Sequence, residues 1–246
     1  MRVLIAEHDH ARYAELLRAA APELEVLTSG DSAELARQAP QCPVWLGQPD
    51  LLASLLRQGH KPGWIQSTWA GITPLLADGL PRDYRLSRAV GIFGQVMAEY
   101  MLTYMLGHER EVLSRLVSQV ERRWDDRPGR SLEGRKVLIV GVGDIGQRVA
   151  EFLQPFGVAL YGVASSAREQ APFVEVAALA DLPRLVGQVD YVLNLLPDTP
   201  ATHDLYDAAL FKCFQPSALF INAGRGVAAV SYTHLRAHET VLEIVC

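Results

Sequence analysis

The feature that most constrains the fold is a glycine motif placed directly after an apolar run. Lys136–Val140 reads as a β-strand, and residues 141–146 follow the pattern G-x-G-x-x-G at the start of a helical segment. In this pattern the first glycine allows a tight turn, the second lets the backbone approach a pyrophosphate, and the third lets the helix pack against the strand. The first N–H groups of the helix also favour phosphate. The motif predicts dinucleotide binding by Gly141, Gly143, Asp144, Ile145 and Gly146.

Short apolar runs alternate with helical patterns along the whole chain. This alternation predicts an α/β fold with parallel sheets covered by helices on both faces. Helical spacing marks Ala11–Ala20, Asp31–Gln38 and Leu51–Arg57, and Asp50 is expected to cap the last of these helices. The expected strands are Arg2–Ala6, Leu24–Thr28, Val44–Gly47, Trp64–Ser67, Arg85–Val90, Lys136–Val140, Val158–Val163, Tyr191–Leu196 and Ala218–Asn222.

A long proline-free stretch, Phe93–Val120, divides the chain. Its apolar residues recur with helical spacing, which predicts one helix with a buried face. The polar loop 125–130 contains Pro128 and Gly129 and ends the helical pattern. We therefore expect a first α/β domain at 1–93 and a second at 94–229.

Composition excludes several classes of protein. The chain of 246 residues carries a net charge of −5, without the clustered basic face that nucleic-acid binding needs. No apolar stretch reaches the roughly 18 residues of a membrane span, and the N-terminus lacks the flanks of a signal peptide. Three widely spaced cysteines suggest neither a disulfide framework nor a zinc site. We expect a cytoplasmic protein with reduced thiols and no metal, nucleic-acid or membrane partner.

The residues after Val158–Val163 bear on the choice of cofactor. A site for NAD usually has Asp or Glu at the end of this strand, where the carboxylate binds the ribose 2′-hydroxyl. Here the chain reads Ala164-Ser165-Ser166-Ala167-Arg168, and the first carboxylate is Glu169. Small hydroxyl residues and a guanidinium suit a 2′-phosphate. The sequence thus predicts a preference for NADP(H) through Ser165, Ser166 and Arg168, with NAD(H) still possible.

Four further segments carry a resemblance to a known family. Residues 194–202 read NLLPDTPAT and residues 220–226 read FINAGRG, in that order after the glycine motif. Upstream of the motif stand QSTWAGI at 66–72 and GIFGQVMAEY at 91–100. These segments resemble the D-2-hydroxyacid dehydrogenases, and the upstream pair particularly resembles their glyoxylate/hydroxypyruvate reductase branch. The resemblance covers about 1–229. It implies a flavodoxin-like substrate domain, then a Rossmann dinucleotide-binding domain that is incomplete in this chain.

The resemblance also implies roles for individual residues. Arg225 matches the family arginine that grips the carboxylate and carbonyl oxygen of a 2-oxo acid, which suits the fixed fork of a guanidinium. Backbone N–H groups of the loop Trp69, Ala70, Gly71 and Ile72 would hold the substrate carboxylate. Residues expected beside the cofactor are Leu196, Pro197, Thr202, Asn222 and Ala223. The family reaction transfers hydride between NAD(P)H and a small 2-oxo acid such as glyoxylate or hydroxypyruvate, and its members are usually homodimers.

The chain departs from the family pattern near its end. In the family, a catalytic glutamate and histidine follow the arginine motif well downstream, whereas this sequence has 21 residues after Arg225. From Ser231 the run SYTHLRAHET resembles the translation of a transposon-based sequencing adapter, so 230–246 is expected to be a non-native tail. On this reading His234, His238 and Glu239 are accidental. We expect a catalytically inactive fragment whose sheet has an unpaired edge after Ala218–Asn222.

Other interpretations of the sequence stay open. A non-catalytic NAD(P)-sensing module would not need the missing histidine. The N-terminal strand followed by acidic residues resembles a phosphorelay receiver, but the expected third strand, Val44–Gly47, does not end in an acceptor aspartate. The cluster His8-Asp9-His10 could ligate a metal, although a helix cap by Asp9 or His10 explains it more simply. His60, His108 and His203 are interpreted as structural or solvated, His203 as a helix cap.

Overall fold

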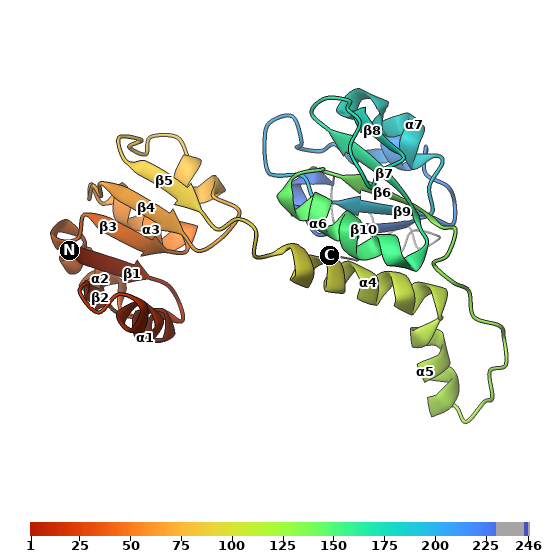
Figure 1. Cartoon of the computed structure of the whole chain (residues 1–246), viewed down its shortest axis with the longest axis horizontal. Coiled ribbons are helices and arrows are strands. Elements are labelled where there is room, and N and C mark those ends of the chain that lie inside the picture. The colour runs from red at the N-terminus through yellow and green to blue at the C-terminus, as the bar shows by residue number, and fades with distance from the viewer. Residues whose placement is uncertain (230–243, 246) are drawn as a thin grey trace. The chain divides into compact units, whose positions relative to one another are not determined.

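The computed structural model of the 246-residue chain describes residues 1–229 and 244–245. The chain divides into two compact units, Met1–Val90 and Gly91–Cys246, which Figure 1 colours from red to yellow and from yellow to blue. Of the non-native tail predicted at 230–246, residues 230–243 and Cys246 lie outside the described residues.

The first unit is a five-stranded parallel sheet with the strand order β2-β1-β3-β4-β5. This is the flavodoxin-like order, so the fold expected for the first domain is confirmed. The strands are β1 Arg2–Ala6, β2 Glu25–Thr28, β3 Val44–Gly47, β4 Trp64–Ser67 and β5 Arg85–Arg88, and the helices are α1 His10–Ala20, α2 Ser32–Gln38 and α3 Pro49–Arg57.

Alternation along β1 places its side chains on both faces of this sheet. Leu4 and Ala6 pack with Trp45 and with residues of α2 and α3, whereas Ile5 packs with Ala14 of α1 on the opposite face. All of these side chains are almost completely buried. A strand with apolar side chains on both faces must be covered by other elements on both sides, as in a layered α/β structure.

Two helix starts in the first unit differ from expectation. Pro49 occupies the first turn of α3 and Gln48 is the N-cap, so Asp50, expected to cap, lies inside the first turn. Proline is favoured at that position because its missing N–H is not needed there, while the carboxylate of Asp50 still complements the helix dipole. Asp9 does occupy the N-cap position of α1, but its side chain makes no capping hydrogen bond.

The second unit contains a six-stranded parallel sheet with the order β11-β10-β9-β6-β7-β8. Counted from β6, this is the Rossmann order 3-2-1-4-5-6 read in reverse, which confirms the expected dinucleotide-binding fold. The strands are β6 Lys136–Val140, β7 Ala159–Ala164, β8 Glu175–Ala178, β9 Tyr191–Asn194, β10 Leu219–Asn222 and β11 Ile244–Val245.

The edge of this sheet corrects one prediction. β11 pairs in parallel with β10, through Phe220 with Ile244 and Ile221 with Val245, so the edge expected to be unpaired carries a strand. β8 was not predicted, because Glu175-Val176-Ala177-Ala178 contains alanines that favour strands weakly. Strand β9 ends at Asn194 rather than at Leu196, since the Asn194 side chain accepts a hydrogen bond from the Leu196 N–H and turns the chain.

Helices cover both faces of the second sheet. Alternate residues of β6 face opposite layers: Val137 and Ile139 pack with α4 (Gly94–Glu109) and α6 (Asp144–Leu153). Leu138 and Val140 pack with α7 (Leu182–Val186) and α8 (Ala208–Phe211). The continuous burial of β6 on both faces is what a central parallel strand requires.

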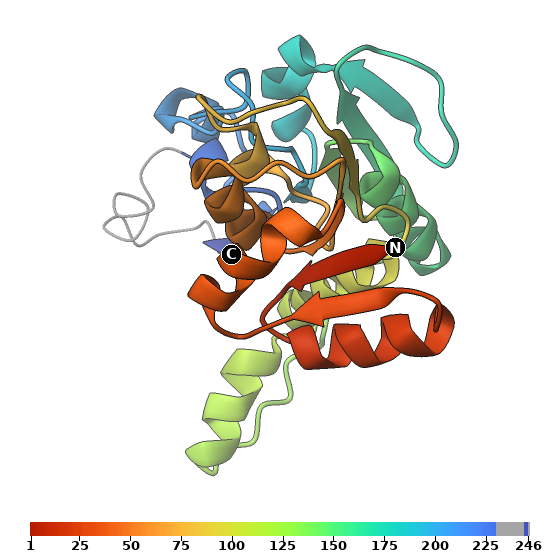
Figure 2. The same cartoon turned by 90° about the vertical axis from the view of Figure 1, so that its left-hand side faces the viewer.

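The stretch 93–120, predicted as one buried helix, is two helices. α4 ends at Glu109 and α5 runs from Val112 to Val120, with Glu111 between them in the left-handed region at φ 51°. The Glu109 carboxylate is buried in ion pairs with Arg130 and Arg135, which holds the end of α4 against the sheet. α5 then extends away from the sheet, as Figures 1 and 2 show. Its apolar residues are therefore exposed rather than buried.

Candidate cofactor and substrate site

The glycine motif joins the end of β6 to the start of α6, and its first and third glycines are required by close packing. Gly141 has φ 110°, and a Cβ there would lie 2.9 Å from the Leu195 carbonyl carbon. A Cβ on Gly146 would lie 2.3 Å from the Gly141 oxygen. Neither position accepts a side chain unless the backbone moves. The first and third glycines thus set the turn and the approach of α6 to β6.

The second glycine faces open space. A Cβ on Gly143 would meet no atom within 4 Å, and Gly143 is the N-cap of α6. In the described part of the chain, the N–H groups of Gly143, Asp144 and Ile145 have no hydrogen-bond partner. Unpaired N–H groups at a helix start, beside a space that a side chain would fill, form a cradle for phosphate. The residues present therefore fit the pyrophosphate of a dinucleotide.

Asp144 is the first residue of α6, and its side chain binds the protein backbone. Its Oδ2 accepts a hydrogen bond from the Gly91 N–H at 3.0 Å. The carboxylate thus fastens the start of the second unit to the glycine loop. Asp144 would contribute its N–H to a phosphate, while its charge complements the positive end of the helix dipole.

The loop after β7 carries the residues predicted to select the cofactor. Ser165, Ser166 and Arg168 are all exposed. The Arg168 guanidinium donates to the Val142 carbonyl at 2.8 Å and to Gln170 Oε1 at 2.6 Å. These bonds hold the guanidinium beside the glycine loop, where a 2′-phosphate on the adenosine ribose would need a cation.

The loop after β9 lies against the glycine loop at the point where the strand order reverses. Leu196 is half-buried and Pro197 is exposed. Thr202, predicted beside the cofactor, is buried, and its Oγ1 donates to the Pro197 carbonyl at 2.7 Å. Its hydroxyl therefore closes the loop on itself. His203, expected to cap a helix, instead pairs with Asp198 of this loop through its Nε2, 2.6 Å from Oδ1.

The loop after β10 carries Arg225. The arginine is exposed, and its Nη1 donates to the adjacent Gly224 carbonyl at 2.8 Å. A Cβ on Gly224 would lie 2.8 Å from the Leu196 oxygen, so this loop packs directly on the β9 loop. Ala223 is half-buried, and its N–H donates to the Asn194 carbonyl. The structure thus brings Arg225, Leu196 and the glycine motif to the carboxyl end of one sheet.

Two residues that the sequence did not single out hold this arrangement together. Asn194 is completely buried and donates from Nδ2 to Asn222 Oδ1 at 2.9 Å. Tyr206 is completely buried and donates its hydroxyl to Asn194 Oδ1 at 3.3 Å. Burial raises the pKa of Tyr206 well above its ordinary value, so the hydroxyl stays a donor. Asn222, predicted beside the cofactor, is itself buried in this network.

In the first unit, the loop predicted to bind a carboxylate follows β4. Ser67 Oγ accepts from the Trp69 N–H and donates to the Trp69 carbonyl, and Arg88 donates to the Ala70 carbonyl at 2.7 Å. Among the residues that the structure describes, the N–H groups of Ala70, Gly71 and Ile72 have no partner. A loop fixed through its carbonyls with its N–H groups unpaired is suited to an anion.

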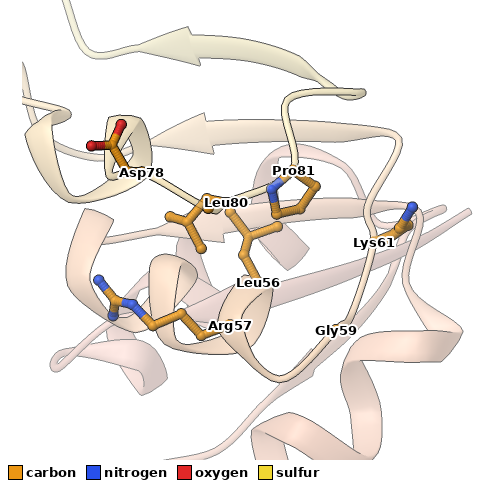
Figure 3. A pocket seen from close by; sticks show the side chains of 8 residues that line it. Leu56, Arg57, Gly59, Lys61, Asp78, Leu80 and Pro81 are labelled. Carbon is orange, nitrogen blue, oxygen red and sulfur yellow. The ribbon is translucent and has the colours of Figure 1, made fainter.

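A hollow elsewhere in the first unit does not belong to this loop. It lies between the end of α3 and the segment that follows Asp78, with Leu56 and Leu80 at its centre (Figure 3). Its lysine, Lys61, already pairs with Asp83. None of the predicted substrate residues lines it.

Within residues 1–229 and 244–245, no cluster of His, Cys, Asp or Glu could hold a metal. None of the helices described there combines the length and the apolar character of a membrane span.

A glycine loop on β6, unpaired N–H groups at α6 and an arginine on the β10 loop define a nucleotide-binding α/β protein of the Rossmann type. A family model described as the NAD-binding domain of D-isomer specific 2-hydroxyacid dehydrogenases matches residues 102–237. Because the match covers more than half of the chain, the protein belongs to this family. The matched range runs past residue 230, where the sequence predicts a foreign tail.

Individual proteins are also similar to this chain. An uncharacterised protein of Streptomyces coelicolor is 32% identical over 176 residues, which are 71% of this chain and 63% of that protein. Glyoxylate/hydroxypyruvate reductase A of Escherichia fergusonii is 28% identical and aligns with 76% of this chain and 61% of its own length. The chain spans between 55% and 66% of the length of the first three curated relatives.

Solved structures show the same fold over almost the whole chain. A D-isomer specific 2-hydroxyacid dehydrogenase family protein from Aeromonas salmonicida superposes with a TM-score of 0.90 at 33% identity, covering 99% of this chain and 81% of that one. An NADPH-dependent glyoxylate/hydroxypyruvate reductase from Sinorhizobium meliloti, solved with NADP and sulfate, gives a TM-score of 0.80 at 26% identity, covering 99% and 81%.

Proposed function

We propose that the whole protein interconverts a small 2-oxo acid and a D-2-hydroxy acid, with glyoxylate or hydroxypyruvate as the substrate class. The observation that carries the proposal is Arg225, exposed on a loop that packs against the cofactor side of the sheet. Relatives named as glyoxylate/hydroxypyruvate reductases support the substrate class.

Each predicted residue then has a physical task. The Arg225 guanidinium binds the substrate carboxylate and polarises the carbonyl oxygen, because its donors lie in a rigid fork. In the first unit, the unpaired N–H groups of Ala70, Gly71 and Ile72 are suited to bind a carboxylate. The glycine loop holds the pyrophosphate. When bound, the nicotinamide cofactor supplies the hydride.

NADP(H) is the preferred cofactor in this proposal, and NAD(H) a poorer one. Its support is the absence of a carboxylate at the end of β7 and the fixed guanidinium of Arg168 beside the glycine loop. An aspartate or glutamate there would repel a 2′-phosphate, whereas an arginine attracts it. The Sinorhizobium meliloti relative was solved with NADP.

The test is a steady-state assay of glyoxylate and hydroxypyruvate reduction with NADPH and with NADH. It is run on residues 1–246 and on the product of the full gene recovered from the source DNA. We expect Arg168→Ala to raise the KM for NADPH about tenfold and to leave that for NADH unchanged, as loss of one phosphate contact costs roughly 1.4 kcal/mol. Arg123→Ala, an exposed arginine outside the cofactor cradle, is the matched control.

The outcomes of the assay separate two kinds of protein. Turnover by the gene product, abolished in Arg225→Ala, supports the dehydrogenase. Tight NADPH binding without turnover of any 2-oxo acid would instead support the alternative, a non-catalytic module that binds NAD(P). The expectation that residues 1–246 alone are inactive remains a prediction, which measurable turnover by this chain would contradict.

A second copy of the chain is proposed to cover α5, giving a homodimer. This short helix exposes Leu113 at 78% and Val120 at 85%, together with Leu116 and Val117, and Trp124 follows at 89%. Contiguous exposed apolar side chains of this kind mark interfaces. Light scattering after gel filtration tests this: the wild type should be dimeric and Leu116→Glu/Val120→Glu monomeric, with Gln119→Glu on the same helix as control. A monomeric wild type would refute the dimer.

A further inference from the structure

The chain contains only two asparagines, and they lie side by side. Asn194 is the last residue of β9 and Asn222 the last of β10, and the two are register partners in the parallel sheet. Asn194 is completely buried and Asn222 is 9% exposed. The Asn194 Nδ2 donates to Asn222 Oδ1 at 2.9 Å, so the two strands are joined by side chains at the point where their backbones diverge.

Each amide also holds a loop. Asn194 Oδ1 accepts from the Leu196 N–H on the β9 loop, at 3.3 Å. Asn222 Oδ1 accepts from the Gly224 N–H at 3.2 Å, and its Nδ2 donates to the Arg225 carbonyl at 3.3 Å. Tyr206 also donates its hydroxyl to Asn194 Oδ1, at 3.3 Å. A continuous set of hydrogen bonds therefore runs from Leu196 on the loop after β9 to the backbone of Arg225.

Only an amide satisfies these contacts, because each asparagine must donate and accept at once. An aspartate at 194 would place an oxygen against Asn222 Oδ1. An aspartate at 222 would place one against the Arg225 carbonyl. Arg225 needs this support, since within the described residues its guanidinium donates only to the carbonyl of its own neighbour, Gly224. A substrate-binding group on an exposed loop is effective only when residues behind it fix its backbone.

We propose that Asn194 and Asn222 are positioning residues, whose buried amide pair fixes the backbone of Arg225 relative to the loop after β9. The proposal deepens, and rests on, the role of Arg225 proposed above. It predicts that substrate affinity depends on the amide pair through Arg225, while the affinity for cofactor depends on it weakly.

The first experiment uses the full chain and requires no substrate. Because there are only two asparagines, labelling with side-chain ¹⁵N-asparagine gives two NH₂ signal pairs in an NMR spectrum. Both should exchange slowly with water, and Asn194→Asp should remove one pair and shift the other. In hydrogen–deuterium exchange, the same variant should accelerate the amides of Ala223 and Gly224 about tenfold, because their acceptors are Asn194 O and Asn222 Oδ1. Solvent-like NH₂ signals in the wild type, or unchanged exchange at these two amides, would overturn the proposal.

The second experiment measures the dissociation constants of NADP⁺ and of oxamate, a stable 2-oxo acid analogue, in the presence of NADP⁺. Asn194→Asp and Asn222→Asp should weaken oxamate about tenfold and NADP⁺ less than threefold. In an Arg225→Ala background, Asn194→Asp should have no further effect on oxamate, which a merely structural role would not produce. Gln188→Glu, an exposed amide-to-acid change in the same unit, is the control.

The results distinguish the two proposals. If Arg225→Ala weakens oxamate binding but Asn194→Asp does not affect it, the positioning role is wrong and the role of Arg225 stands. If Arg225→Ala also leaves oxamate binding unchanged, the proposed function of Arg225 fails. The exchange of the Ala223 and Gly224 amides then still decides whether the amide pair holds the loop after β10.

Discussion

At the scale of single residues, identical amino acids in one motif have different tasks. Gly141 and Gly146 are required because side chains there would collide with backbone, whereas Gly143 borders empty space. Gly141 and Gly146 therefore serve folding, and Gly143 serves the ligand. The spacing G-x-G-x-x-G alone does not make this distinction visible.

The distinction can be tested with two alanine variants. Gly146→Ala should lower the free energy of unfolding by about 1–3 kcal/mol, because its Cβ overpacks the contact with the Gly141 oxygen. Gly143→Ala should change stability by less than about 0.5 kcal/mol and weaken NADP⁺ about tenfold, since its methyl group occupies the phosphate cradle. Urea unfolding and a fluorescence titration measure both, and equal stability of the two variants would contradict the assignment.

Tyr206 predicts a dependence of stability on alkaline pH. Its pKa in the folded state is raised above the ordinary value of 10.0 by burial. The neutral phenol is thus favoured by folding, so its contribution is complete below pH 10 and is lost as pH rises towards the folded pKa. Above pH 10 the free energy of unfolding should fall by up to about 1.4 kcal/mol per pH unit from this group. Tyr206→Phe should flatten that slope in urea titrations between pH 9 and 11, whereas Tyr104→Phe, at a half-exposed tyrosine, should not.

At the scale of elements, a buried ion network decides where α4 ends. The Glu109 side chain is 3% exposed and accepts from Arg130, Arg135 and the Tyr191 hydroxyl, the last at 2.6 Å. Burial, followed by this hydrogen bond, raises the pKa of Tyr191. The network ties the C-terminus of α4 to the loop before β6 and to β9. The chain can then leave the sheet as α5.

Removing the charge of Glu109 should therefore be costly. We expect Glu109→Gln to lower the free energy of unfolding by about 3 kcal/mol, because it leaves two guanidinium groups without their buried partner. The exposed pair Glu121–Arg123 is the matched control, and Glu121→Gln should cost less than about 1 kcal/mol. Equal effects in denaturant unfolding would show that the network does not anchor α4.

At the scale of the whole molecule, the described residues of the cofactor cradle all belong to the second unit, Gly91–Cys246. A ligand stabilises the part of a protein that binds it. NADP⁺ at a hundredfold excess over its Kd should stabilise this unit by about 2.7 kcal/mol. Hydrogen exchange should show global protection of β6 and β9 increasing, with β1 and β3 of the first unit unchanged. An equal increase in hydrogen-exchange protection in both units on adding NADP⁺ would mean that the two units unfold together.

Much of the fold was predictable because its signals are local. Apolar runs of strand length marked every strand of the first sheet, and the glycine motif located β6 and α6. A strand buried on both faces and a turn that only glycine accepts are imposed by neighbouring residues, so the chain's own order of amino acids reveals them. The family motifs likewise pointed to the loops after β4, β9 and β10, where the proposed substrate and cofactor residues lie.

What only the tertiary structure decided involves residues far apart in the chain. Asn194 and Asn222 are 28 positions apart, and Glu109 reaches Tyr191 across 82. The break after α4, the short strand β8 and the burial of Tyr206 all depend on such contacts. Local sequence cannot specify them, because the free energy of a buried hydrogen bond or ion pair comes from the surroundings that exclude water. The amino-acid sequence by itself determined which chemistry the loops carry, and the packing of the sheet decided which side chains hold those loops in place.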